Sequence, residues 1–519
     1  MSGTSDDTSA PPAAAKSRPW LKGCCWGCGA CVMAFLLLVV VLCVFLARVP
    51  KIYPVSARPV APPEPTNHAA AALDGFESPY LGHTGSWDGK GGGMGGSSKS
   101  GDLDKEAAMG LRWTFMPVYW RALEPEGPVD LAKETPTAWQ RLDAFVVEAH
   151  RRRLNILMQA PVMGGNAGGP PNWAGRREPG KSAPEQMDAA AAFAGKLASR
   201  YAPGGTLAVK QGWGLGYGVR AWELDNEPEG YLTHWKDQAG DYAEFATKTA
   251  ARIKAVDPRA VIALPGCGGG HQSVNWIEGA LDAPRLAGSP AYRKQAVGFS
   301  IGPVADVVSF HDYEGLDSGF AGGDRTLEPV LDDVRDVFER WETRQAGSAR
   351  GRKLEFWHTE GNFDFLGLLS ARRRAAWRMQ MFTRAFAAGI AKVCVMDASK
   401  AEQVAVRAYV RALPWPFPML PADAEARVVR GKARAFRHPE HAGPAAGQTW
   451  VLWARADSGA AQVEIPVTHD RVTIVGVDGL ESVREVANHR LTLELEGDPK
   501  MAPPVLVLDR PLIPRNTPQ

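Results

Sequence analysis

The sequence predicts a (β/α)8 barrel followed by an antiparallel β-sandwich, with a hydrophobic segment near the N-terminus. Three observations support this prediction. Short apolar runs alternate with amphipathic helical runs from about residue 76 to residue 400. Beyond residue 400 the helical period gives way to two-residue alternation. A stretch without charged residues, 23–47, precedes both regions.

The N-terminal segments predict a membrane anchor. Residues 1–22 are polar and predict a cytoplasmic tail. The 25 residues of 23–47 rise about 1.5 Å each, and the resulting length of roughly 37 Å exceeds a hydrocarbon core of about 30 Å. An uncleaved signal anchor is favoured over a cleaved signal peptide because the run exceeds a usual signal core and no clear cleavage motif precedes Arg48. Residues 48–75 hold six prolines and predict a stiff linker.

Composition excludes some classes of protein. The 59 Lys and Arg residues nearly balance 57 Asp and Glu residues, giving a net charge of +2, which argues against a nucleic-acid partner. Of seven cysteines, only Cys267 and Cys394 lie downstream of the N-terminal hydrophobic region, so no disulfide framework is expected. No pattern in the sequence predicts an oligomeric state.

Eight candidate strands alternate with helical segments and predict a barrel over residues 76–400. On the first clear helix, Trp139, Leu142, Val146 and Ala149 fall on one face. A doubly wound open sheet is the alternative fold, but no Gly-rich phosphate loop follows an early strand. The predicted strands are 78–82, 113–119, 154–161, 219–226, 261–265, 306–311, 354–359 and 392–396.

The C-terminal region, 401–519, predicts a small antiparallel β-sandwich. Its candidate strands alternate between apolar and polar residues, and part of an earlier strand is expected near Ala424. The alternating runs are 449–454, 462–466, 471–477, 490–496 and 504–508.

Two carboxylates follow predicted barrel strands. Strand four runs into WELDNEP (222–228), and strand seven runs into WHTEGN (357–362). Functional groups of a (β/α)8 barrel lie at the C-terminal ends of its strands. Cleavage of a glycosidic bond needs one carboxylic acid and one carboxylate on opposite sides of the anomeric carbon. Glu227 and Glu360 are therefore the candidate catalytic residues.

Several motifs together resemble the clan A glycoside hydrolases, and most closely family 39 and its bacterial polysaccharide-degrading relatives. They are Asn-Glu-Pro after strand four, Glu after strand seven, LEPEG (123–127), PNWA (171–174) and HDY (311–313). The resemblance implies a retaining mechanism with Glu227 as acid/base and Glu360 as nucleophile. It implies that Asn226 binds the sugar 2-hydroxyl, that Tyr313 orients Glu360 and that His311 lines the same site.

Some residues extend or depart from that pattern. Trp87, Trp120, Trp173 and Trp357 are candidate platforms for sugar rings. Family members often carry Arg within strand two, where this chain has Phe115. The last barrel strand lacks the Trp that often contacts the sugar. Glu124 lies in a predicted turn and is expected to cap a helix or face solvent rather than to react.

Two other functions compete with the hydrolase. The first is a non-catalytic carbohydrate-binding protein at the cell surface, which retention of both Glu residues disfavours. The second is a metallohydrolase using His311, Asp312, His358 and Glu360, but neighbouring strand residues such as His311 and Asp312 point to opposite faces. We expect no metal and no cofactor. A polysaccharide or oligosaccharide substrate would place the barrel outside the cytoplasm, in a periplasm or at the cell surface.

Overall fold

The chain divides into two compact units, Met1–Arg48 and Val49–Gln519, and every described residue belongs to the second. The predicted tail, anchor and linker lie outside the described residues. Among the described residues, no helix has the length and apolar character needed to cross a membrane. The computed structural model describes residues 78–83, 100–163, 168–178, 180–228, 235, 239–267, 274, 276–281, 298–311, 327–344, 354–361, 370–396, 398–414, 419–439, 447–455, 458–498 and 501–510.

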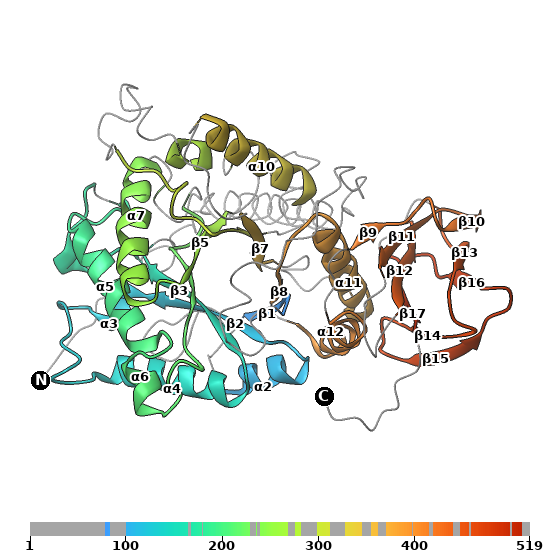
Figure 1. Cartoon of the computed structure of the whole chain (residues 1–519), viewed down its shortest axis with the longest axis horizontal. Helices are drawn as coiled ribbons and strands as arrows, with labels where there is room; N and C mark the ends of the chain where they lie inside the picture. Colours follow the sequence, from blue (N-terminus) through green and yellow to red (C-terminus); the bar gives the residue numbers. More distant parts are fainter. Residues whose placement is uncertain are drawn as a thin grey trace, which may run out of the picture. The chain divides into compact units, whose positions relative to one another are not determined.

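Eight parallel strands form the predicted barrel, in the order β7-β6-β5-β4-β3-β2-β1-β8 (Figure 1). The ring closes between β7 and β8, where the His358 N–H donates to the Lys392 carbonyl at 2.8 Å and the Ala391 N–H to the Phe356 carbonyl at 2.7 Å. The strands are β1 (Tyr80–His83), β2 (Trp113–Tyr119), β3 (Asn155–Val162), β4 (Ala221–Glu223), β5 (Val261–Cys267), β6 (Val307–His311), β7 (Glu355–Glu360) and β8 (Val393–Val395).

Large apolar side chains fill the barrel interior. Phe115, Trp113 and Trp357 are buried there together with smaller residues from the other strands. The rings of Trp113 and Trp357 meet edge to face at 5.8 Å. Because the interior is packed, substrate can reach only the rim of the barrel, where strands end and loops begin.

Helices cover the outside of the barrel (Figure 1). Trp139, Leu142, Val146 and Ala149 of α4 are buried, as the sequence periodicity predicts. The described helices are α2 (Ser100–Ala108), α3 (Trp120–Leu123), α4 (Thr137–Arg151), α5 (Met187–Tyr201), α6 (Thr206–Lys210), α7 (Ala239–Val256), α10 (Leu327–Arg344), α11 (Ala371–Ala387) and α12 (Lys400–Ala412).

The C-terminal region contains two antiparallel sheets, ordered β10-β13-β16 and β15-β14-β17-β12-β11-β9. Along β12, Trp450 and Leu452 join a cluster shared by the two sheets, whereas Val451 and Trp453 join the cluster of the barrel. The strands are β9 (Leu420–Pro421), β10 (Arg427–Arg430), β11 (Ala433–His438), β12 (Gln448–Ala454), β13 (Ala461–Pro466), β14 (Arg471–Val475), β15 (Glu481–Glu485), β16 (Arg490–Leu495) and β17 (Val505–Asp509).

The sheets attach to the barrel through α11 and α12. Arg372 of α11 forms a two-pronged ion pair with Glu496 at 2.6 Å, and the buried Gln380 amide donates to the Ala502 carbonyl at 2.7 Å. The helix α12, which follows β8, continues beyond the predicted boundary at residue 400, where the sequence analysis expected strands. The division into domains as a whole stays a prediction.

Candidate active site

Three barrel strands deliver the central residues of the candidate site. His311 is the last residue of β6 and Glu360 is the last residue of β7. Glu227 lies four residues beyond the end of β4. Because parallel strands end at the same rim, these three side chains come from segments far apart in sequence and meet in one place.

His311 contacts both candidate carboxylates. Its Nδ1 atom lies 2.7 Å from Oε1 of Glu227 and 3.7 Å from Oε2 of Glu360. These two oxygens are therefore no farther apart than the sum of the two distances, about 6.4 Å. Retaining glycosidases hold their carboxyl groups about 5–5.5 Å apart, whereas inverting enzymes hold them about 6.5–9.5 Å apart.

The charge on His311 follows from this placement. The side chain is buried, and burial lowers the pKa of an imidazole, but the charge of Glu360, the hydrogen bond with Glu227 and the charges of Glu227 and Glu223 outweigh that effect. Together they raise the pKa of His311 to about 10. The cationic form of His311 is thus favoured while Glu227 and Glu360 are ionised, and it reduces the repulsion between them.

His358, the neighbouring histidine on β7, behaves in the opposite way. Burial, reinforced by the charges of His311 and Arg378 and opposed by that of Glu360, lowers the pKa of His358 to about 3. Its Nδ1 accepts from the Cys394 N–H at 3.3 Å, so the neutral ring carries its proton on Nε2. Within the described residues, no group of three or more His, Cys, Asp or Glu side chains is arranged to hold a metal ion. Asp312 lies outside them.

A sharp turn after β4 positions Asn226 and Glu227. Asp225 has φ +67° and Glu227 has φ +36°, values that only a few per cent of residues other than glycine adopt. The buried Asp225 carboxylate holds the turn by accepting from the N–H groups of Met163 at 3.0 Å and Asn226 at 2.9 Å. Its second oxygen accepts from the Trp235 indole N–H at 2.6 Å. This turn also explains why β4 ends at Glu223, short of the predicted 226.

Two of the four predicted sugar platforms are wrong, and a third, Trp87, lies outside the described residues. Trp120 is 0% exposed and Trp357 is 1% exposed, so neither ring offers a face to a sugar. Trp120 stacks on Phe193 at 5.8 Å, because the short helix α3 turns its side chain into the protein. Trp357 points into the barrel interior, three residues before Glu360 at the end of β7. Trp173 is partly exposed, and its role stays a prediction; Tyr313 lies outside the described residues.

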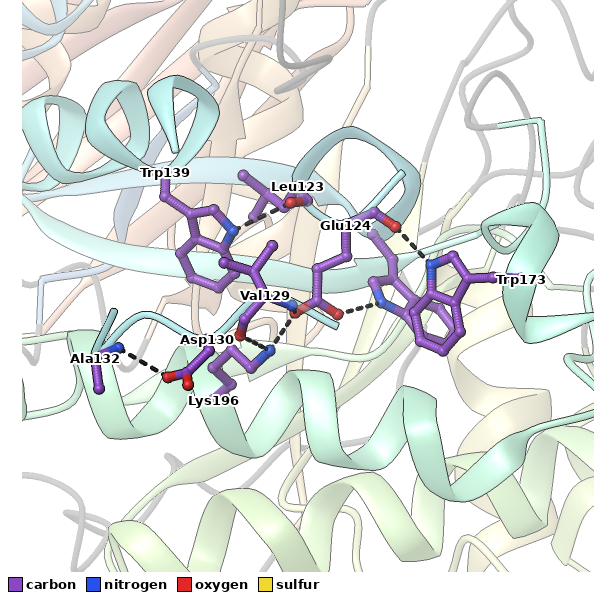
Figure 2. Close-up of polar contacts among 9 residues, drawn as sticks. Leu123, Glu124, Val129, Asp130, Ala132, Trp139, Trp173 and Lys196 are labelled. Atoms are coloured by element: carbon purple, nitrogen blue, oxygen red, sulfur yellow. Dashed lines mark hydrogen bonds and ion pairs between the residues drawn. The ribbon is translucent and has the colours of Figure 1, made fainter. Parts of the chain in front are cut away.

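Glu124 organises the loop that carries Trp173 (Figure 2). Glu124 is the C-cap residue of α3, as expected, but its side chain is buried, which corrects the expectation of a surface residue. Oε1 accepts from the Val129 N–H at 2.9 Å and pairs with the Lys196 ammonium, and Oε2 accepts from the Trp120 indole at 3.1 Å. The Glu124 carbonyl accepts from the Trp173 indole at 2.8 Å. The residue therefore fixes the orientation of Trp173.

The sequence did not indicate three residues next to the candidate carboxylates. His83, the last residue of β1, places Nε2 3.9 Å from Oε2 of Glu360 and its ring centre 4.9 Å from that of Phe115. Phe115 itself is buried in the barrel, so β2 supplies no Arg at this point. Gln159 of β3 and Glu223 of β4 lie behind Asn226. A single His or Gln in an apolar run carries no signal of its own.

Comparisons with known proteins give distant structural matches. No family model matches the chain, and no curated sequence does. A GH30 endoxylanase from Clostridium papyrosolvens matches at 12% identity and TM-score 0.49, over 83% of this chain and 96% of that one. A family 51 α-L-arabinofuranosidase from Bifidobacterium longum matches at 12% identity and TM-score 0.49, over 88% of this chain and 98% of that one. A glucosidase from Croceicoccus marinus matches at 12% identity and TM-score 0.46, over 78% of this chain and 91% of that one. All three scores fall below one half, so the fold assignment rests on the strand order.

Proposed function

We propose that this protein is a retaining glycoside hydrolase in which Glu227 is the acid/base and Glu360 the nucleophile. The observation that supports this most directly is the shared contact of both carboxylates with Nδ1 of His311. The upper bound of about 6.4 Å on the distance between these two oxygens lies below the separation of about 6.5–9.5 Å in inverting enzymes, which favours a double displacement on one sugar ring.

In the first step, the Glu360 carboxylate attacks the anomeric carbon while Glu227 protonates the glycosidic oxygen. The bond to the leaving group breaks and a glycosyl-enzyme ester forms. In the second step, Glu227 takes a proton from a water that attacks the same carbon, and Glu360 is released as a carboxylate. Esterification removes the Glu360 charge, the largest influence that raises the pKa of His311. That pKa therefore falls in the intermediate and recovers when the ester is hydrolysed.

The substrate and location are proposed from sequence alone. An anchor at 23–47 and a proline-rich linker at 48–75 would hold the barrel above the outer face of a membrane. A polysaccharide or oligosaccharide that is exported or remodelled there is the substrate class that suits this placement.

Azide rescue tests the assignment. Glu360→Ala should lose hydrolysis of aryl glycosides, and azide should restore turnover with a glycosyl azide of inverted configuration. Glu339→Ala, an exposed position on α10, is the matched control and should behave as the wild type. Unchanged hydrolysis by Glu360→Ala would overturn the role of Glu360. A wild type that binds polysaccharides but cleaves none would instead support the carbohydrate-binding alternative.

A further inference from the structure

Three polar side chains form a line that runs from the barrel interior to the candidate site. Glu223 of β4 and Gln159 of β3 are paired in the strand register, and both are buried. The Gln159 Nε2 atom lies 2.6 Å from Oε1 of Glu223 and 3.1 Å from Oδ1 of Asn226. Asn226 is partly exposed and immediately precedes Glu227.

The direction of each hydrogen bond in this line follows from the carboxyl group at its inner end. Oε1 of Glu223 accepts, so Gln159 must present its NH2 group rather than its carbonyl. The second N–H of that group then points at Asn226, which must present Oδ1. Asn226 is thereby left with its NH2 group for the cleft, and among the described residues Nδ2 donates to no protein atom.

Glu223 is itself held from a third strand. Ser309 Oγ of β6, two residues before His311 on the same strand, lies 2.5 Å from Oε2 of Glu223 and also contacts the Leu264 carbonyl, an oxygen that can only accept. Glu223 also contributes to the electrostatic field that keeps His311 charged. One buried carboxylate therefore lies behind both the amide and the imidazole of the candidate site.

We propose that Glu223 and Gln159 are positioning residues that fix Asn226 as a hydrogen-bond donor to the substrate. Given the proposed hydrolase, the site then selects sugars that present a hydroxyl oxygen as acceptor beside the reacting carbon. A sugar without that hydroxyl leaves the Asn226 amide unpaired.

Exchanging the side chains of Glu223 and Gln159 tests whether their hydrogen bonds set the orientation of the Asn226 amide. In the Glu223→Gln/Gln159→Glu double variant, the inner hydrogen bond and the net charge are retained, but the carboxylate now faces Asn226. Asn226 must then turn its NH2 group inward and present Oδ1 to the cleft. Thermal unfolding of the variant shows whether the exchange is tolerated, and the single variant Glu223→Gln removes the directional constraint without reversing it.

The readout is kcat/KM for two aryl glycosides that differ only in a 2-hydroxyl or a 2-hydrogen. Because 2-deoxy sugars react intrinsically faster, the ratio between the substrates is compared across proteins. Losing one oriented donor lowers the preference for the 2-hydroxy substrate by on the order of a hundredfold in the exchanged variant. A smaller fall is expected in Glu223→Gln. Equal ratios in the wild type and a folded double variant would overturn the proposal.

Neutron diffraction of the wild type tests the orientation of Asn226 directly. Its result does not depend on whether the protein hydrolyses glycosides or on whether the double variant folds. We expect deuterons on the Asn226 side-chain atom that faces the cleft, which identifies it as Nδ2. An oxygen at that position would overturn the proposal. A wild type that cleaves neither glycoside would refute the hydrolase, while the neutron result would still decide the polarity of Asn226.

Discussion

Nδ1 of His311 lies 2.7 Å from Oε1 of Glu227, which joins the end of β6 to the turn after β4. The same atom lies 3.7 Å from Oε2 of Glu360 on β7. A single buried cation thus connects three strand ends. Its effect on stability is measurable without knowledge of the substrate.

Replacing His311 by Asn should change how stability depends on pH. The folded-state pKa of about 10 lies above the usual value of about 6.5 for an unfolded chain. The imidazolium therefore contributes stability that is complete below about pH 6.5 and is lost as the pH rises through about 10. Urea unfolding of the wild type and His311→Asn should show a stability difference that shrinks between these values. A difference that stays constant with pH would show that His311 is not charged in the folded protein.

The turn after β4 should depend on the two oxygens of Asp225. Asp225→Asn keeps a side chain that tolerates positive φ but removes one acceptor, so one buried N–H loses its partner. Such a loss costs about 1–3 kcal/mol of unfolding free energy. Asp225→Ala should cost more, because it removes both oxygens and because Ala, unlike Asp and Asn, is not enriched at a positive φ such as +67°. Chemical unfolding of both variants measures their unfolding free energies. Equal stability of Asp225→Ala and Asp225→Asn would contradict the prediction.

The architecture and the candidate pair were readable from sequence because both depend on local patterns. Buried parallel strands are apolar runs, and Asn226-Glu227 and Glu360 each follow such a run directly. Contacts of His83 and Gln159 were not readable, since they depend on how β1 approaches β7 and how β3 pairs with β4. Trp120 was misjudged because its direction is set by α3, a four-residue helix without a sequence signature. The strand expected near Ala424 corresponds to β10, whereas β15 was missed because its residues are all exposed and show no alternation of burial.

Glu124 and Lys196 should be coupled in stability. Glu124→Gln leaves the Lys196 ammonium facing a neutral amide. Removing one partner of a buried pair costs about 3–5 kcal/mol, and the cost here should be smaller because the Lys196 side chain is 25% exposed. Glu124→Gln/Lys196→Met should recover part of the loss, since no unpaired charge remains. Urea unfolding of Glu124→Gln, Lys196→Met and the double variant gives the coupling energy, and strictly additive losses would show that the two charges act independently.

Trp173 and Trp120 should respond differently to the same substitution, although their rings meet edge to face at 5.4 Å. Trp173 is partly exposed and its indole N–H is held by the Glu124 carbonyl, so of these two rings it is the one that reaches solvent. Trp173→Ala should raise KM for a long oligosaccharide by about tenfold, the scale of one stacking contact of about 1–1.5 kcal/mol. It should leave kcat for a small aryl glycoside unchanged. Trp120→Ala removes a fully buried indole and should instead lower stability by about 3–5 kcal/mol. An unchanged KM for every chain length in Trp173→Ala would remove this residue from the binding surface.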